Sequence, residues 1–114
     1  GTRTASITGG CVALADACAW IAGRQGIASP FGSLVAAVSV GVVEGEPMLD
    51  LAYIEDRDAH VDANVVMREP DQFVEVQGTG ENATYSRAQL DVLLDLAGSG
   101  IRELFHAQRR ALGW

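Results

Sequence analysis

The sequence predicts an α+β fold in two layers, in which a four-stranded, mostly antiparallel sheet packs with two main helices. Apolar residues recur at helical spacing near both ends of the chain, and four short strand-like segments lie between these ends. Clusters of Gly, Pro and Asp separate the segments. Because 114 residues suffice for one modest core but not for two, we expect residues 1–114 to form a single domain.

The first helix is predicted from a stripe of apolar residues close to the N-terminus. Gly23 is the expected C-terminal cap of this helix, and the Gly- and Pro-containing residues 23–33 are expected to form a surface connection. The stripe consists of Ile7, Cys11, Leu14, Ala15, Cys18, Ile21 and Ala22.

Two hairpins are predicted in the middle of the chain. Residues 34–43 are β-branched and almost wholly apolar, which is typical of a central strand covered on both faces. After a turn at 44–47, residues 48–54 are expected to pair with that strand. Residues 61–67 and 72–78 are expected to form the second pair of strands.

The predicted strand at 61–67 has two different faces. Val61, Ala63, Val65 and Met67 share one face, while Asp62 and Asn64 share the other. We therefore expect the two polar side chains to point away from the core.

The last helix has a clear start. Ser86 and Gln89 form the S-x-x-Q pattern of a capping box, and an apolar stripe continues through residues 90–112. Gly98 and Gly100 interrupt this stripe, and we expect a kink or a short break at these positions.

Composition limits the environment and the partners. No run approaches the roughly 18 consecutive apolar residues of a membrane span, and no signal-peptide layout precedes the first helix. Cys11 and Cys18 have no metal-ligand spacing and are expected to be free, small buried hydrophobes, which suits a reducing compartment. We therefore expect a cytoplasmic protein with no membrane partner.

The net charge of −7 opposes binding of a polyanion unless a local site, a metal ion or another chain supplies the attraction.

The opening stretch GTRTASITGG, residues 1–10, is a candidate anion site. The first turn of a helix carries unpaired N–H groups and the positive end of the helix dipole, and small residues let an anion approach. Thr2 and Ser6 offer hydroxyl donors, and Arg3 can grip a phosphate through two parallel hydrogen bonds. The alternative is an exposed arginine beside an ordinary N-cap threonine.

The segment DRDAHVD, residues 56–62, is a candidate acidic site. A loop that folds back onto the start of a strand can bring Asp56 close to Asp62, and Asp58 is a second possible partner for Asp62. Two such carboxylates suit a hydrated Mg²⁺ ion, or a pair in which one acid donates a proton to a leaving group. The alternative is a solvated polar loop, with His60 as one of its surface residues.

Taken together, the motifs resemble, in the same order along the chain, the C-terminal half of the bacterial ribonuclease PH family. The resemblance covers essentially all 114 residues. It rests on GTRTASITGG, VAAVSVGVVEGEPMLDL, YIEDRDAHVDANVVM, FVEVQGTGE and YSRAQLDVLLDLAGSGI. The fold that it implies is half of a ribonuclease PH-like fold.

The resemblance implies a phosphorolytic 3′→5′ exoribonuclease that trims tRNA 3′ ends. Such an enzyme transfers nucleotides to inorganic phosphate and releases nucleoside diphosphates. On this resemblance Gly1, Thr2 and Arg3 bind the phosphate. Asp56 and Asp62 correspond to the two essential aspartates of the family, with a Mg²⁺-binding or general-acid role. The chain departs from the family pattern at Arg57 and Ala63, beside these carboxylates.

The resemblance also implies partners. The family assembles as a ring of six subunits built from three dimers, and it acts on RNA. The N-terminal half of the family, with another phosphate-contacting arginine and most of the basic RNA surface, has no counterpart in these 114 residues. Two alternatives to an active enzyme are a non-catalytic ring subunit and an inactive phosphate-binding fragment that only assembles.

Overall fold

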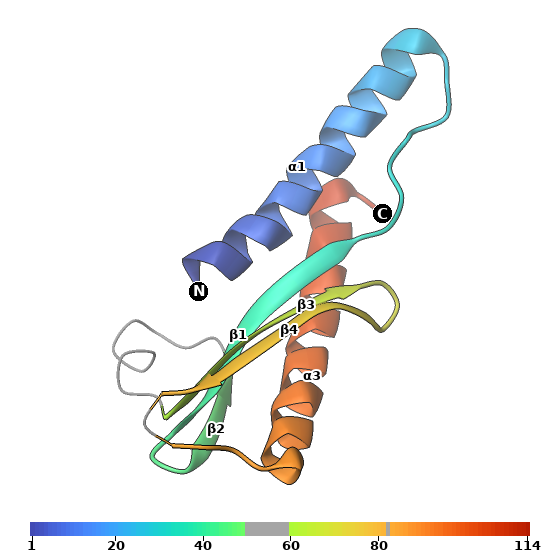
Figure 1. The fold of residues 1–114 in the computed structure, drawn as a ribbon. Helices are drawn as coiled ribbons and strands as arrows, with labels where there is room; N and C mark the ends of the chain where they lie inside the picture. The colour runs from blue at the N-terminus through green and yellow to red at the C-terminus, as the bar shows by residue number, and fades with distance from the viewer. Residues whose placement is uncertain (50–59, 82) are drawn as a thin grey trace.

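A computed structural model describes residues 1–49, 60–81 and 83–114 (Figure 1). The elements confirm the predicted α+β class, with a four-stranded antiparallel sheet and two long helices. In chain order they are α1 (Thr2–Gln25), β1 (Val35–Val43), β2 (Glu46–Leu49), β3 (Val61–Arg68), β4 (Gln72–Gly80) and α3 (Arg87–Leu112).

The sheet has the strand order β2-β1-β3-β4, and all its pairs are antiparallel. The β1–β2 hairpin turns at Glu44 and Gly45, both of which have positive φ angles. Strand β1 is buried along almost its whole length, which confirms the prediction of a central strand covered on both faces. The predicted partner strand at 48–54 begins two residues earlier, at Glu46, and its residues from 50 onward lie outside the described part of the chain.

Helix α3 covers one face of this sheet. Its N-cap is Ser86, whose side chain accepts a hydrogen bond from Gln89 N while the Gln89 side chain accepts one from Ser86 N, so the predicted capping box is confirmed. The side chains between α3 and the sheet form the main core. The buried cluster consists of Leu34, Ala36, Val38, Val40, Val42, Val61, Ala63, Val65, Met67, Leu93, Ala97, Ile101 and Phe105.

The two glycines of α3 do not break the helix, contrary to the prediction of a kink or break. Helix α3 runs without interruption from Arg87 to Leu112. A Cβ atom at Gly100 would lie 2.8 Å from Leu49 Cδ2, so the missing side chain makes room for β2. The reason for a glycine here is close packing of helix on strand, which a helical pattern alone does not reveal.

Helix α1 lies along the part of β1 that β2 leaves uncovered. Within the described part of the chain, β2 pairs with residues 40–43 of β1, and polar backbone groups of the earlier residues bond to other partners. Thr8 Oγ1 accepts a hydrogen bond from Ala37 N at 3.1 Å, and Cys11 Sγ accepts one from Val35 N at 3.3 Å. The sheet edge is thus closed by side chains of α1.

The outer surface of α1 is apolar and exposed. Leu14 is 58% exposed and Trp20 64%, and the C-terminal half of the helix extends past the sheet (Figure 1). The predicted stripe was therefore wrong at Leu14 and Ile21, because only Thr4 and Ala15 of this helix are fully buried.

Helix α1 ends three residues later than the sequence indicated. Its cap is Gly26, in the left-handed conformation, rather than Gly23. By length and composition alone this helix could cross a membrane, a property that core helices of soluble proteins share. Counting consecutive apolar residues missed this feature, because single polar residues interrupt the run.

Candidate functional site

The sheet face opposite α3 carries the polar side chains of β3. Opposite residues in antiparallel strands place their side chains on the same face. The register aligns Ser39, Asn64 and Gln77 in one row, and the next row contains Asp62 and Thr79. The prediction that Asp62 and Asn64 point away from the core is confirmed.

The start of α1 lies over this polar face. A Cβ atom at Gly1 would lie 4.0 Å from Ser39 Oγ, which in turn donates a hydrogen bond to Asn64 Oδ1 at 3.1 Å. Asp62 is two residues from Asn64 along β3, a spacing of about 7 Å in a strand. The fold therefore brings the start of α1 and Asp62, which are 61 positions apart in sequence, to the same face of the sheet.

The first turn of α1 has the features of an anion-binding helix start. Its N-cap is Gly1, no side chain caps the turn, and no acidic residue lies in it. The exposed Thr2 is the first helical residue. Ser6 differs from the prediction, because its hydroxyl donates to Thr2 O at 2.8 Å and is turned back along the helix.

Arg3 is held by a residue that sequence reasoning missed. Its Nη2 donates to both carboxylate oxygens of Glu75 on β4, at 2.9 and 3.1 Å. The two side chains are 52% and 40% exposed, so the pair is accessible to solvent. Glu75 is opposite Val66, on the polar face. Only the strand register places it near Arg3, and no local motif indicates this.

The acidic site is described only in part. Asp62 is half-buried on β3, whereas Asp56 and Asp58 lie outside the described residues. Within residues 1–49, 60–81 and 83–114, no group of three or more His, Cys, Asp or Glu residues is arranged to hold a metal ion. Asp62 offers carboxylate oxygens, the ligand type that Mg²⁺ prefers. The pairing of Asp56 with Asp62 stays a prediction.

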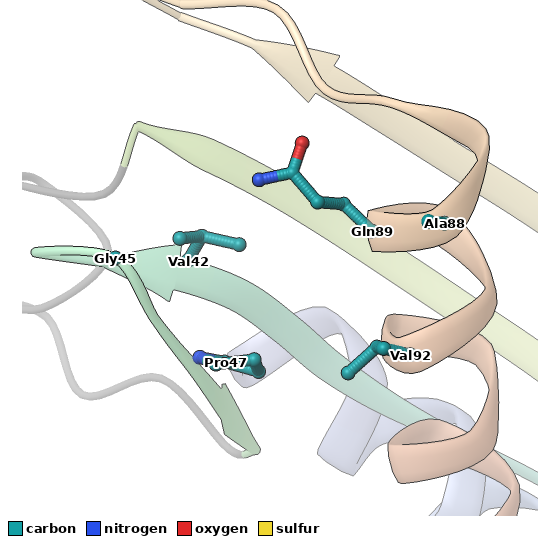
Figure 2. Close-up of a pocket in the computed structure, with 6 residues that line it drawn as sticks. All are labelled: Val42, Gly45, Pro47, Ala88, Gln89 and Val92. Atoms are coloured by element: carbon teal, nitrogen blue, oxygen red, sulfur yellow. The ribbon is translucent and has the colours of Figure 1, made fainter.

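Two hollows lie on the other side of the sheet, among the described residues. Figure 2 shows a pocket of about 200 Å³ between the β1–β2 turn and the start of α3, lined by Val42, Pro47 and Val92 among others. A second hollow of about 440 Å³ lies between α3 and the β3–β4 hairpin, beside Phe73 and Asp95. The residues at the start of α1 line neither of these two hollows.

An uncapped helix start that carries an arginine thus lies on the same face of an antiparallel sheet as a strand aspartate. Helix starts of this kind favour anions. The model of the 3′ exoribonuclease family, domain 2, matches residues 33–100. The chain belongs to that family.

Curated relatives carry the name ribonuclease PH. The chain is 57% identical to the protein of Corynebacterium efficiens, over 99% of this chain and 46% of that protein. It is 53% identical to the protein of Synechococcus sp., over 98% of this chain and 48% of that protein. The chain thus spans about half the length of the curated relatives that it matches.

Solved structures share the fold at low sequence identity. Rice Rrp46 superposes with a TM-score of 0.72 at 19% identity, covering 97% of this chain and 47% of that one. A chain of the Archaeoglobus fulgidus exosome with RNA bound to the active site has a TM-score of 0.60 at 20% identity, covering 75% of this chain and 35% of that one. Both confirm the α+β fold.

Proposed function

We propose that this chain supplies the phosphate-binding and acidic residues of a phosphorolytic 3′→5′ exoribonuclease that trims tRNA 3′ ends. The observation that carries the proposal is the placement of the α1 start and Asp62 on one face of the sheet, about one row apart. A shared face is required if phosphate and the RNA 3′ end are to meet. Family membership and the identity to ribonuclease PH proteins support the same reaction class.

The first residues would hold the attacking phosphate. The backbone N–H groups at the start of α1, the Thr2 hydroxyl and the Arg3 guanidinium are donors that stabilise a phosphate anion. Gly1 leaves room for the anion at the helix start. If the site holds phosphate in line with the 3′-terminal phosphodiester, the two reactants no longer have to meet by diffusion in the correct orientation. This lowers the barrier to the reaction.

The aspartates would act at the leaving oxygen. A phosphate oxygen forms a bond to the phosphorus of the terminal phosphodiester, the bond from that phosphorus to the 3′ oxygen breaks, and the 3′ oxygen takes up a proton. Asp62, with Asp56, would supply this proton or hold Mg²⁺, which stabilises negative charge on oxygen when bound. The oxygen ligands of Asp62 suit such an ion.

The exposure of Arg3 and the charge of the chain favour a shared active site. Arg3 is half exposed, and a chain with a net charge of −7 does not attract RNA by itself. We propose that the N-terminal half of the family completes the site, and that the assembled protein is a hexameric ring of dimers in the cytoplasm.

The test is release of nucleoside diphosphate from an RNA with a short 3′ extension. The chain is assayed alone and after addition of the N-terminal half of a ribonuclease PH relative, each with and without inorganic phosphate. Phosphate-dependent release from the mixture supports the proposal. If the folded chain forms a complex with the added half but releases nothing, it is a non-catalytic ring subunit or an inactive phosphate-binding fragment, and the enzymatic proposal is refuted.

A further inference from the structure

We propose that Glu75 sets the phosphate affinity of this site by competing with phosphate for Arg3. The inference rests on the proposed function, since it takes the α1 start as the phosphate site. It adds a residue of β4 that the phosphate-binding motif at the N-terminus does not contain.

The first argument concerns the nitrogen of Arg3 to which Glu75 is hydrogen-bonded. A guanidinium can grip an anion by two parallel hydrogen bonds along two edges, one formed by Nη1 and Nη2 and the other by Nε and Nη2. Both edges include Nη2. Glu75 accepts from Nη2 with both of its oxygens, at 2.9 and 3.1 Å, and so pairs with the nitrogen that both edges share. A phosphate that binds along the edge facing Glu75 must displace or share this carboxylate.

The second argument is the direction in which Glu75 holds Arg3. Glu75 is opposite Val66, and Asp62 is four residues away from Val66 along β3, which is about 13 Å in a strand. The helix start, at the row of Asn64, lies between these two positions. The ion pair therefore draws the guanidinium to the side of the helix start that is remote from Asp62.

The third argument is the strength of the pair. With side chains that are 52% and 40% exposed, the Arg3–Glu75 pair is screened by solvent and weak. A phosphate dianion that also gains the helix N–H groups competes successfully for the guanidinium. Glu75 thus lowers the affinity for phosphate without abolishing binding.

The experiment is a titration of the 114-residue chain with inorganic phosphate, followed by ³¹P NMR. We expect Glu75→Gln to lower the Kd for phosphate about two- to fivefold, the range that corresponds to a partly exposed ion pair. In an Arg3→Gln background the same substitution should have no effect, because the competition needs the guanidinium. This coupling to Arg3 is a readout that a purely structural role of Glu75 would not produce.

Glu103→Gln is the matched control. It removes one negative charge from an exposed position on α3, which packs against the opposite face of the sheet, and it should leave the phosphate Kd unchanged. An equal gain of affinity in this control would show a general charge effect and overturn the inference.

Other results separate this inference from the proposed function. Weaker or unchanged phosphate binding in Glu75→Gln refutes competition, even where phosphorolysis by the assembled protein is intact. The absence of phosphate binding in both the unmodified chain and Glu75→Gln also refutes it, whereas the proposed function stands or falls on nucleoside diphosphate release. Circular dichroism of each variant confirms that the fold is retained.

Discussion

The side chain of Gln108 on α3 is hydrogen-bonded to both α1 and β1. Replacing Gln108 by methionine tests how much these hydrogen bonds stabilise the packing of α1 on the sheet. This buried side chain, 2% exposed, donates from Nε2 to Val35 O at 2.9 Å and to Thr8 O at 3.1 Å. Its own Oε1 is buried without a hydrogen-bond partner in the described part of the chain. Methionine keeps the length and most of the volume of the side chain but removes the amide.

The expected loss of stability follows from the groups that the substitution leaves unpaired. Val35 O lies on the strand edge that β2 does not cover, and a buried unpaired carbonyl costs about 1–3 kcal/mol. Thr8 O lies inside α1, where the i→i+4 hydrogen bond still pairs it. Removing the unpaired Oε1 returns about 1 kcal/mol, so from the middle of that range we expect Gln108→Met to lower the free energy of unfolding by about 1 kcal/mol.

Thermal unfolding followed by circular dichroism measures this effect. A chain of this size loses about 4 °C in Tm per kcal/mol, so the expected decrease is about 4 °C. His106→Met, an exposed position on the same helix, is the control and should shift stability by less than about 0.5 kcal/mol. A Gln108→Met chain as stable as the unmodified one would refute the conclusion that this amide fastens α1 to the sheet.

Three further predictions concern α3 and the site. Ser86→Ala removes the acceptor for Gln89 N at 3.1 Å and should cost about 1 kcal/mol in urea unfolding; an unchanged midpoint would mean that the capping box contributes nothing. Gly100→Val places a side chain where a Cβ already lies 2.8 Å from Leu49 Cδ2, and should cost about 1–3 kcal/mol. Adding Leu49→Ala should recover part of that loss, and strict additivity of the two substitutions would contradict the contact. Asp62→Asn in the reconstituted protein should lower the rate of nucleoside diphosphate release about 100-fold or more, while RNA affinity measured by fluorescence anisotropy changes little; an unchanged rate removes Asp62 from the mechanism.

Local patterns were sufficient for most of the elements. The capping box at Ser86 and the alternation around Asp62 are interactions between near neighbours in sequence, so the start of α3 and the two faces of β3 were predicted correctly. The apolar segment at 34–43 likewise indicated a central strand.

The errors occurred where a distant segment decides the role of a residue. Gly100 is explained by Leu49 on β2, and the exposure of Leu14 by the narrow contact of α1 with the sheet. Neither partner can be read from a helical repeat, because the repeat reports which residues share a face but not what covers that face.

For the candidate site, too, the sequence indicated some features and the tertiary structure decided others. The residue types at the N-terminus and around Asp62 indicated phosphate and acid chemistry from sequence alone, since helix starts and paired carboxylates have these properties in any fold. Only the tertiary structure placed the start of α1 over the row of Asn64 and brought Glu75 onto Arg3. That contact joins residues 72 positions apart through the register of β3 and β4, and register is set by the packing of the whole sheet.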